Sequence, residues 1–189
     1  MNFQEKEYWT NRYIKNETGW NIGFPSTPLR DYIDQLKNKA LKILIPGAGN
    51  AYEAEYLYKL GFKNVYILDI SDVTLKDFKK RNSDFPDNQL LHEDFFTHDS
   101  KYDLILEQTF FCSMTPTEKN RTNYAKKMHE LLKPNGKFVG LWFNFPLNND
   151  FNKRPFGGNK MLYLGYFSEY FKIITFENCY NSIPERSEK

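Results

Sequence analysis

The chain of 189 residues has few of the side chains from which proteins build metal centres or disulfide frameworks. Its two cysteines, Cys112 and Cys179, are too few for a network of disulfides or a cysteine cluster around a metal. Its three histidines, at positions 92, 98 and 129, do not fall at the spacing of zinc ligands. We therefore expect no metal in the site of this protein.

Long apolar runs and an excess of one charge are also missing. No apolar stretch approaches the length of about 18 residues that marks a membrane span, and the N-terminal MNFQEKEYW carries charges and lacks the apolar run of a signal peptide. Lysine and arginine (26) nearly balance aspartate and glutamate (24), and the most basic run, from Lys76 to Arg81, is interrupted by Asp77 and Phe78. The expectation is a cytoplasmic monomer whose partner is a small molecule, not a nucleic acid or a membrane.

What the chain does contain is an alternation of short apolar runs with amphipathic segments. A helix is predicted over residues 4–15, and a second begins with Thr27 as its cap and Pro28 at its first position. A capping box from Thr115 to Glu118 starts a later helix, and a turn over Lys133–Gly136 precedes the last strand. Strands are predicted at 41–45, 65–70, 89–91, 102–106 and 137–143, separated by helices at 52–60, 73–81 and about 115–132. This order predicts one domain, residues 1–189, with a doubly wound, mostly parallel α/β sheet of the Rossmann type.

The stretch ILIPGAGNAYE, residues 43–53, places a Gly-x-Gly turn directly after the first predicted strand. In such sheets ligands bind beyond the carboxyl ends of the strands, and glycines let the backbone approach them. Asp69 ends the second strand, 22 residues after Gly47, which is the spacing at which a carboxylate binds ribose hydroxyls. A plain strand-to-helix turn at Gly47 and Gly49 and a capping role for Asp69 are the structural alternatives.

Two further features distinguish between the ligands that bind at such a turn. A pyrophosphate needs a close-packed glycine turn at the helix N-terminus, where this chain has Ala51-Tyr52 followed by Glu53 and Glu55. A ligand with a positive sulfonium and no phosphate suits that crowding and that charge, so the turn favours S-adenosylmethionine over a dinucleotide. Asp94-Phe95, just after the third strand, is placed to bind the adenine amino group and ring nitrogen.

Several motifs, in order along the chain, are similar to those of one family. They are W-x3-Y-x6-W at Trp9, Tyr13 and Trp20, the segments IPGAGNAYE, LDIS, EDFF and YDLILEQTFFCSM, then PNGKFVGL, RPFGG and the terminal SIPER. On these motifs the chain resembles the thiopurine S-methyltransferase family, and more closely its bacterial and plant-type relatives that methylate small thiols and halide ions. The resemblance implies a class I methyltransferase fold and S-adenosylmethionine as the cofactor.

The resemblance also implies which residues bind the cofactor. An N-terminal segment, here residues 1–27, closes over the cofactor as a lid in the family, which implicates Trp9, Tyr13 and Trp20. The other implied contacts are Gly47 and Gly49 in the turn, Asp69 for the ribose, Asp94 and Phe95 for the adenine, and Glu107 and Gln108 beside the methionine part and the sulfonium. The chain departs from the family at Gln108, where an arginine or tyrosine is expected, and at Ala51, where a glycine is expected. The first departure bears on the acceptor.

An acceptor pocket is expected beside the cofactor. Trp20 stands where the family has an aromatic that touches both ligands, and Phe110, Phe111 and Phe156 are candidates for the pocket wall. Arg154 and Arg186 are candidates to attract an anionic acceptor. No catalytic residue is assigned, because methyl transfer from a sulfonium needs alignment and a dry site above all.

The predicted function is S-adenosylmethionine-dependent methyl transfer to a small, soft nucleophile. A thiol or hydrosulfide is the expected acceptor, and a halide ion is the alternative. Two other functions stay open: a non-catalytic module that binds the cofactor or another molecule, and an NAD-dependent oxidoreductase on the same type of sheet.

The C-terminus departs from the family. Relatives continue after the SIPER segment into a final apolar strand, whereas this chain stops at Glu188-Lys189. The final strand is therefore expected to be missing: either the chain is truncated or the fold tolerates a six-stranded sheet.

Overall fold

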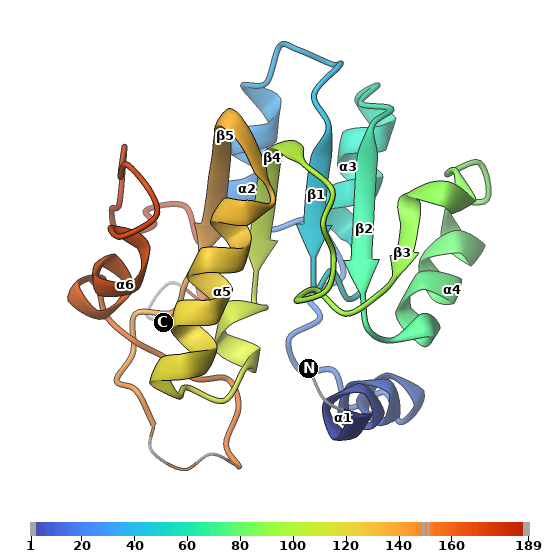
Figure 1. The fold of residues 1–189 in the computed structure, drawn as a ribbon. Coiled ribbons are helices and arrows are strands. Elements are labelled where there is room, and N and C mark those ends of the chain that lie inside the picture. The colour runs from blue at the N-terminus through green and yellow to red at the C-terminus, as the bar shows by residue number, and fades with distance from the viewer. Residues whose placement is uncertain (1–2, 149, 151, 187–189) are drawn as a thin grey trace.

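The structure is a computed structural model, which describes residues 3–148, 150 and 152–186. Its centre is a sheet of five strands in the order β3-β2-β1-β4-β5, and every neighbouring pair is parallel. The strands are β1 (Ile43–Pro46), β2 (Val65–Asp69), β3 (Leu90–His92), β4 (Tyr102–Gln108) and β5 (Leu132–Leu141). Because all five run the same way, their carboxyl ends meet at one edge, towards which the arrowheads of β1, β2 and β4 point in Figure 1. The predicted parallel α/β fold is confirmed.

Six helices surround this sheet among the described residues. They are α1 (Phe3–Ile14), α2 (Thr27–Asp34), α3 (Tyr52–Lys59), α4 (Asp72–Arg81), α5 (Glu118–Glu130) and α6 (Lys160–Phe167). α5 lies in front of the sheet and α2 and α3 lie behind it, while α1 lies beyond the carboxyl ends of the strands (Figure 1). None of the described helices has the length and apolar character needed to cross a membrane.

The alternation of side chains along the strands builds a core on each face of the sheet. Ile43 and Ile45 pack with α2, α3 and α4, whereas Leu44 between them packs with α5 and α6. Leu104 and Ile105 divide in the same way along β4. Successive side chains of a strand point to opposite faces, so an apolar run buried on both sides is what a parallel sheet between two layers of helices requires.

The predicted starts of two helices are wrong in detail. Ser26, not Thr27, is the N-cap of α2. Thr117 caps α5 by accepting a hydrogen bond from the Asn120 N–H (3.2 Å), so Pro116 precedes the helix instead of lying inside it. In each case a neighbouring residue of suitable type takes the cap, because several small polar residues stand together at both helix starts.

The fifth strand begins earlier than predicted. β5 starts at Leu132 and contains the predicted turn as an irregularity: Tyr102 pairs with Leu132, and Leu104 then pairs with Lys137. Asn135 adopts a φ of 63° there. The turn residues therefore bulge out of the ladder without ending it.

No strand follows β5 in the described part of the chain, so the sheet has one strand fewer than the six-stranded alternative. After Leu141 the chain forms loops and α6, a helix that the sequence reading did not include. The ring of Trp142 stacks on Phe176 with centroids 5.6 Å apart. Glu188 and Lys189 lie outside the described residues.

Candidate functional site

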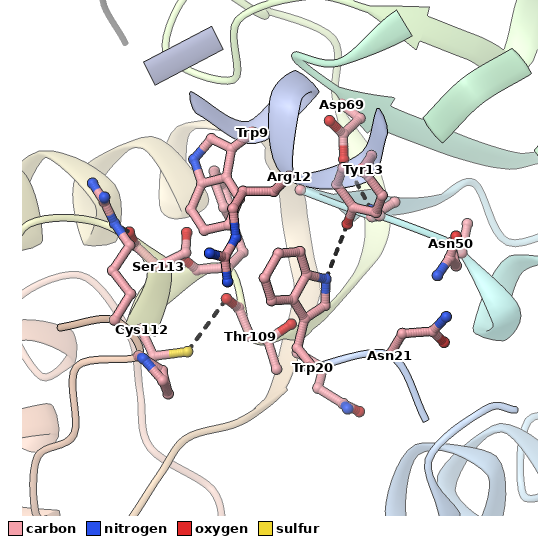
Figure 2. A pocket seen from close by; sticks show the side chains of 18 of the residues that line it. Trp9, Arg12, Tyr13, Trp20, Asn21, Asn50, Asp69, Thr109, Cys112 and Ser113 are labelled. Atoms are coloured by element: carbon pink, nitrogen blue, oxygen red, sulfur yellow. Dashed lines mark hydrogen bonds between the residues drawn. The ribbon is translucent and has the colours of Figure 1, made fainter. Parts of the chain in front are cut away.

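A cavity of about 720 Å³ opens at the carboxyl ends of the strands. Its walls come from α1 and the segment after it, from the loops that follow β1, β2, β3 and β4, and from the C-terminal segment. Most of the predicted site residues line it: Trp9, Tyr13, Trp20, Gly47, Gly49, Asp69, Phe95, Gln108, Phe110, Arg154 and Arg186. Figure 2 labels Trp9, Tyr13, Trp20 and Asp69 among them. The volume is in the range of sites for small molecules and cofactors.

The turn after β1 has the left-handed backbone that glycine favours. Gly47 and Gly49 have φ values of 57° and 54°, and a side chain at either position would also collide with an aromatic residue. A Cβ at Gly47 would lie 2.5 Å from the ring of Phe110, and one at Gly49 would lie 2.5 Å from the hydroxyl of Tyr13. Ala51 adopts the same conformation (φ 54°) despite its Cβ. Conformation and close approach together therefore require both glycines.

Asp69 ties this turn to the end of β2. Its side chain is buried, and its two carboxylate oxygens accept hydrogen bonds from the N–H groups of Gly49 (2.9 Å) and Ser71 (2.8 Å). Burial raises the pKa of Asp69, and these two N–H groups act in the opposite direction. Since a carboxylate has about four acceptor sites, Asp69 keeps capacity for two further donors from a ligand.

An aromatic cluster from the N-terminal segment covers the turn. Trp20 contacts Trp9 edge-on with ring centroids 5.5 Å apart, and its indole N–H donates to the Tyr13 hydroxyl (3.1 Å, Figure 2). Burial and the nearby Asp69 charge raise the pKa of Tyr13. The Arg12 guanidinium lies 5.7 Å from the centre of the Trp20 ring. The predicted aromatic residues and the predicted ribose carboxylate are thus brought together.

The N-terminal helix is held by specific contacts. The hydroxyls of Thr10 and Ser71 are hydrogen-bonded (3.2 Å), which links α1 to the start of α4. Arg154 pairs with Glu5 (2.8 Å), donates to the Ser113 carbonyl (2.6 Å) and lies over the ring of Tyr8. The charge of Arg154 therefore has a partner in the protein.

Arg186 also lines the cavity. Its guanidinium donates to the Trp20 carbonyl (2.6 Å), and no described carboxylate lies within salt-bridge distance of it. Its charge interacts at longer range with Glu53, whose carboxylate accepts from the Ser26 N–H (2.9 Å). Of the two predicted arginines, Arg154 has an ion-pair partner among the described residues and Arg186 has none there.

Four predicted residues do not line the cavity: Asp94, Glu107, Phe111 and Phe156. The Asp94 carboxylate accepts from the Phe96 N–H (2.9 Å). Phe111 and Phe156 are fully buried behind the wall. The cavity is also lined by residues that the sequence analysis did not predict as contacts, among them Glu53, Glu93, Cys112, Phe143 and Phe145. The last two follow β5, in a segment with no motif that would have marked them.

Glu107 shapes the wall from behind. Its fully buried carboxyl accepts from the N–H groups of Phe110 (2.7 Å) and Phe111 (3.1 Å), and so fixes the turn that presses Phe110 against Gly47. Its second oxygen lies buried without a hydrogen-bond partner among the described residues, as do the Tyr124 hydroxyl and the Trp142 N–H. Burial raises the pKa of Glu107 to about 7, against the effect of the two backbone N–H groups.

This raised pKa predicts a dependence of stability on pH. Between the pKa of about 4.3 for an unfolded glutamate and the folded value of about 7, the unfolded chain releases a proton that the folded protein keeps. The free energy of unfolding should therefore fall as pH rises through this window, by about 4 kcal/mol in all, and level off above it. Urea denaturation of Glu107→Gln from pH 5 to pH 8 should lack this fall. Parallel curves for the two proteins would exclude Glu107 as its source.

The comparisons with known proteins agree with this geometry. The model of thiopurine S-methyltransferase matches residues 4–185. The chain belongs to the thiopurine S-methyltransferase family. It is 31% identical over 140 residues to a probable thiol methyltransferase 2 of Arabidopsis thaliana, covering 71% of this chain and 61% of that protein. It is 27% identical to thiocyanate methyltransferase 1 of the same plant, covering 98% of this chain and 82% of that protein. The chain thus spans about three fifths of the first of these relatives.

A solved structure is similar in fold. A TehB-like SAM-dependent methyltransferase from Corynebacterium glutamicum superposes with a TM-score of 0.54 and 18% identity, covering 89% of this chain and 84% of that one. At 18% identity, the likeness shows that the two chains share a fold, and it says nothing about the substrates of this protein.

Proposed function

We propose that this protein transfers a methyl group from S-adenosylmethionine to a small, soft, anionic nucleophile, a thiol or hydrosulfide, with halide as the alternative acceptor. The observation that carries the proposal is the meeting, in one cavity, of the glycine turn with Asp69, the Trp9–Trp20 cluster and the Arg186 guanidinium. The relatives named for thiol and thiocyanate methylation support the acceptor class.

The charges of the cavity suit this cofactor. Three carboxylates, of Glu53, Asp69 and Glu93, are part of the wall. They would repel the phosphates of a dinucleotide and attract the ammonium and sulfonium of S-adenosylmethionine. Asp69 has free acceptor sites for the two ribose hydroxyls. The close turn at Gly47 and Gly49 suits the methionine part of the cofactor, which carries no phosphate. When bound, the cofactor supplies a methyl group already activated on a positive sulfur.

The chain's own residues supply a dry, aligned site. Trp9, Trp20 and Phe110 form an apolar wall that excludes water, which strengthens the electrostatic interactions inside. Arg186, joined to the Trp20 backbone, can attract an anion to the same wall. The thiol of Cys112 also lines the cavity, but burial raises its pKa, so it stays neutral and donates to the Thr109 carbonyl (3.3 Å, Figure 2). Cys112 is therefore part of the cavity wall and does not compete with the acceptor as a nucleophile.

We further propose that residues 1–27 act as a lid. α1 lies across the carboxyl ends of the strands (Figure 1), and its polar contacts outside its own segment include Thr10–Ser71 and Glu5–Arg154. Neither contact involves a strand, so the segment can open and close while the sheet stays folded.

The pH dependence of turnover should follow the acceptor. A thiol of pKa about 8.5 is roughly 3% thiolate at pH 7, so kcat/KM for a small thiol should rise about tenfold per pH unit towards that pKa. With iodide, which has no proton to lose, the profile should be nearly flat between pH 6 and pH 8. A steep rise with iodide would mean that a protein group titrates in the reaction, with Glu107 as the first candidate to test by Glu107→Gln.

A further inference from the structure

We propose that Arg121 on α5 and Tyr163 on α6 are positioning residues for the methyl acceptor. Neither side chain is part of the described cavity wall. Each donates a hydrogen bond to the backbone of one part of the loop that follows β5, and this loop bounds the acceptor end of the cavity. The inference rests on the methyl transfer proposed above and deepens it, because it names the groups that set the position of the acceptor.

The loop after β5 lies at the end of the cavity away from the predicted cofactor residues. It contributes Phe143, Phe145, Arg154 and Pro155 to the cavity wall. The glycine turn and Asp69 stand at the ends of β1 and β2, whereas β5 forms the edge of the sheet opposite β3 (Figure 1). A cofactor whose ribose is bound at the end of β2 therefore leaves the part of the cavity beside this loop for the acceptor.

Two parts of this loop pack against each other in a way that glycine alone allows. The Gly158 N–H donates to the Phe145 carbonyl (2.9 Å), and a Cβ at Gly157 would collide with that same carbonyl and with the Phe145 ring. A Cβ at Gly158 would lie 2.6 Å from the ring of Tyr163. The two glycines of the RPFGG segment thus join residues 154–158 to Phe145, so a shift of one part displaces the other.

Arg121 holds the second of these two parts. Its side chain is 1% exposed, and its Nη2 donates to the Gly157 carbonyl (3.2 Å). The guanidinium also lies 4.8 Å from the centre of the Phe111 ring. Its Nε and Nη1 are buried without a hydrogen-bond partner among the described residues. Because a charged donor makes a stronger hydrogen bond than a neutral one, the Gly157 carbonyl is firmly anchored to α5.

Tyr163 holds the first part. Its ring is 2% exposed, and its hydroxyl donates to the Phe143 carbonyl (2.7 Å). The rings of Phe143 and Phe145 lie 5.1 Å apart, so both aromatic groups of the wall depend on this attachment. The Phe156 N–H donates to the Cys112 carbonyl (2.7 Å), which ties the loop to the neighbouring wall. A wall fixed in this way can hold an acceptor in line with a methyl group, and small displacements of reacting groups are costly.

Tyr163→Phe is the mildest test, because it removes one hydroxyl and keeps the ring. The KM for the acceptor, hydrosulfide or iodide, should rise about three- to tenfold, since one buried hydrogen bond to the wall is lost. The Kd for S-adenosylhomocysteine, measured by calorimetry, should stay within about twofold of the wild-type value. Tyr166→Phe is the matched control on the same helix. Its hydroxyl donates to Glu118 (2.8 Å) and it is not part of the described wall, so both constants should stay unchanged.

Arg121→Met should raise the same KM at least tenfold, because a charged hydrogen bond is lost, and Arg121→Lys should recover part of the loss. A lower thermal midpoint with an unchanged KM in both Arg121→Met and Tyr163→Phe would make the two residues purely structural and the inference wrong. Equal losses of acceptor and S-adenosylhomocysteine binding in Tyr163→Phe would also overturn it, and this variant decides alone if Arg121→Met does not fold. A wild-type protein that methylates neither acceptor would overturn the proposed function itself, so the two failures are distinguishable.

Discussion

Asp69→Ala should lower the affinity for S-adenosylmethionine at least tenfold, and more if both ribose hydroxyls bind the carboxylate. Each charge-assisted hydrogen bond lost contributes about 1.5–3 kcal/mol. The buried carboxylate also holds the N–H groups of Gly49 and Ser71, so the variant loosens the turn that the cofactor crosses. Isothermal titration with S-adenosylmethionine and with S-adenosylhomocysteine measures the loss.

Because the same carboxylate stabilises the turn, the variant needs a folding control. Asp69→Asn keeps the shape and one oxygen acceptor, and its thermal midpoint should lie between those of the wild type and Asp69→Ala. Its affinity should still fall, because the negative charge is gone. Unchanged binding in a folded Asp69→Asn would place the ribose elsewhere in the cavity.

Trp20→Ala should reduce methyl transfer about a hundredfold while leaving the sheet folded. The Trp20 side chain packs on Trp9 and donates to the Tyr13 hydroxyl, so its loss opens the cavity to water. The Trp20 carbonyl that accepts from Arg186 belongs to the backbone and is kept in the variant. Misplacement of reacting groups by about 1 Å can cost a hundredfold in rate. Ile14→Ala is the matched control, because Ile14 ends α1, is 61% exposed and is not part of the cavity wall.

Limited proteolysis tests the lid itself. Trypsin cleavage after Arg12 or Lys15 should slow when S-adenosylhomocysteine is added, because closure over a ligand adds contacts to Trp9, Tyr13 and Trp20. Equal cleavage rates with and without the ligand would make α1 a fixed part of the scaffold. The links of Thr10 to Ser71 and of Glu5 to Arg154 make this contrary result a real alternative.

The fold was predictable because its signals are local. The runs around Ile43 and Val65 are short, apolar and followed by turn residues, and both became buried parallel strands. The first residues of α2 and α5 were harder to predict. Ser26 and Thr27 can each cap α2, Thr115 and Thr117 can each cap α5, and only packing decides between them. The early start of β5 depends on pairing with Tyr102, a contact that no local pattern encodes.

The residues of the site also differ in how far local sequence patterns predict them. Gly47, Gly49 and Asp69 were visible because the chemistry of the turn restricts the residue types and their spacing. The engagement of Arg154 with Glu5 was not visible, because it joins residues 149 positions apart. The same reason hid the burial of Phe111 and Phe156 and the access of Phe143 and Phe145 to the cavity. Side-chain direction beyond a strand end is set by tertiary packing, which a sequence pattern does not record.

The most direct test of the account is transfer of labelled methyl from S-adenosylmethionine to a panel of acceptors: hydrosulfide, a small thiol, thiocyanate, iodide and an alcohol. We expect label in the products of the sulfur or halide acceptors and none in that of the alcohol, with Arg186→Ala raising KM for the anionic acceptors. A protein that binds S-adenosylhomocysteine in calorimetry but methylates none of the sulfur or halide acceptors would contradict the proposal and identify a non-catalytic cofactor-binding module.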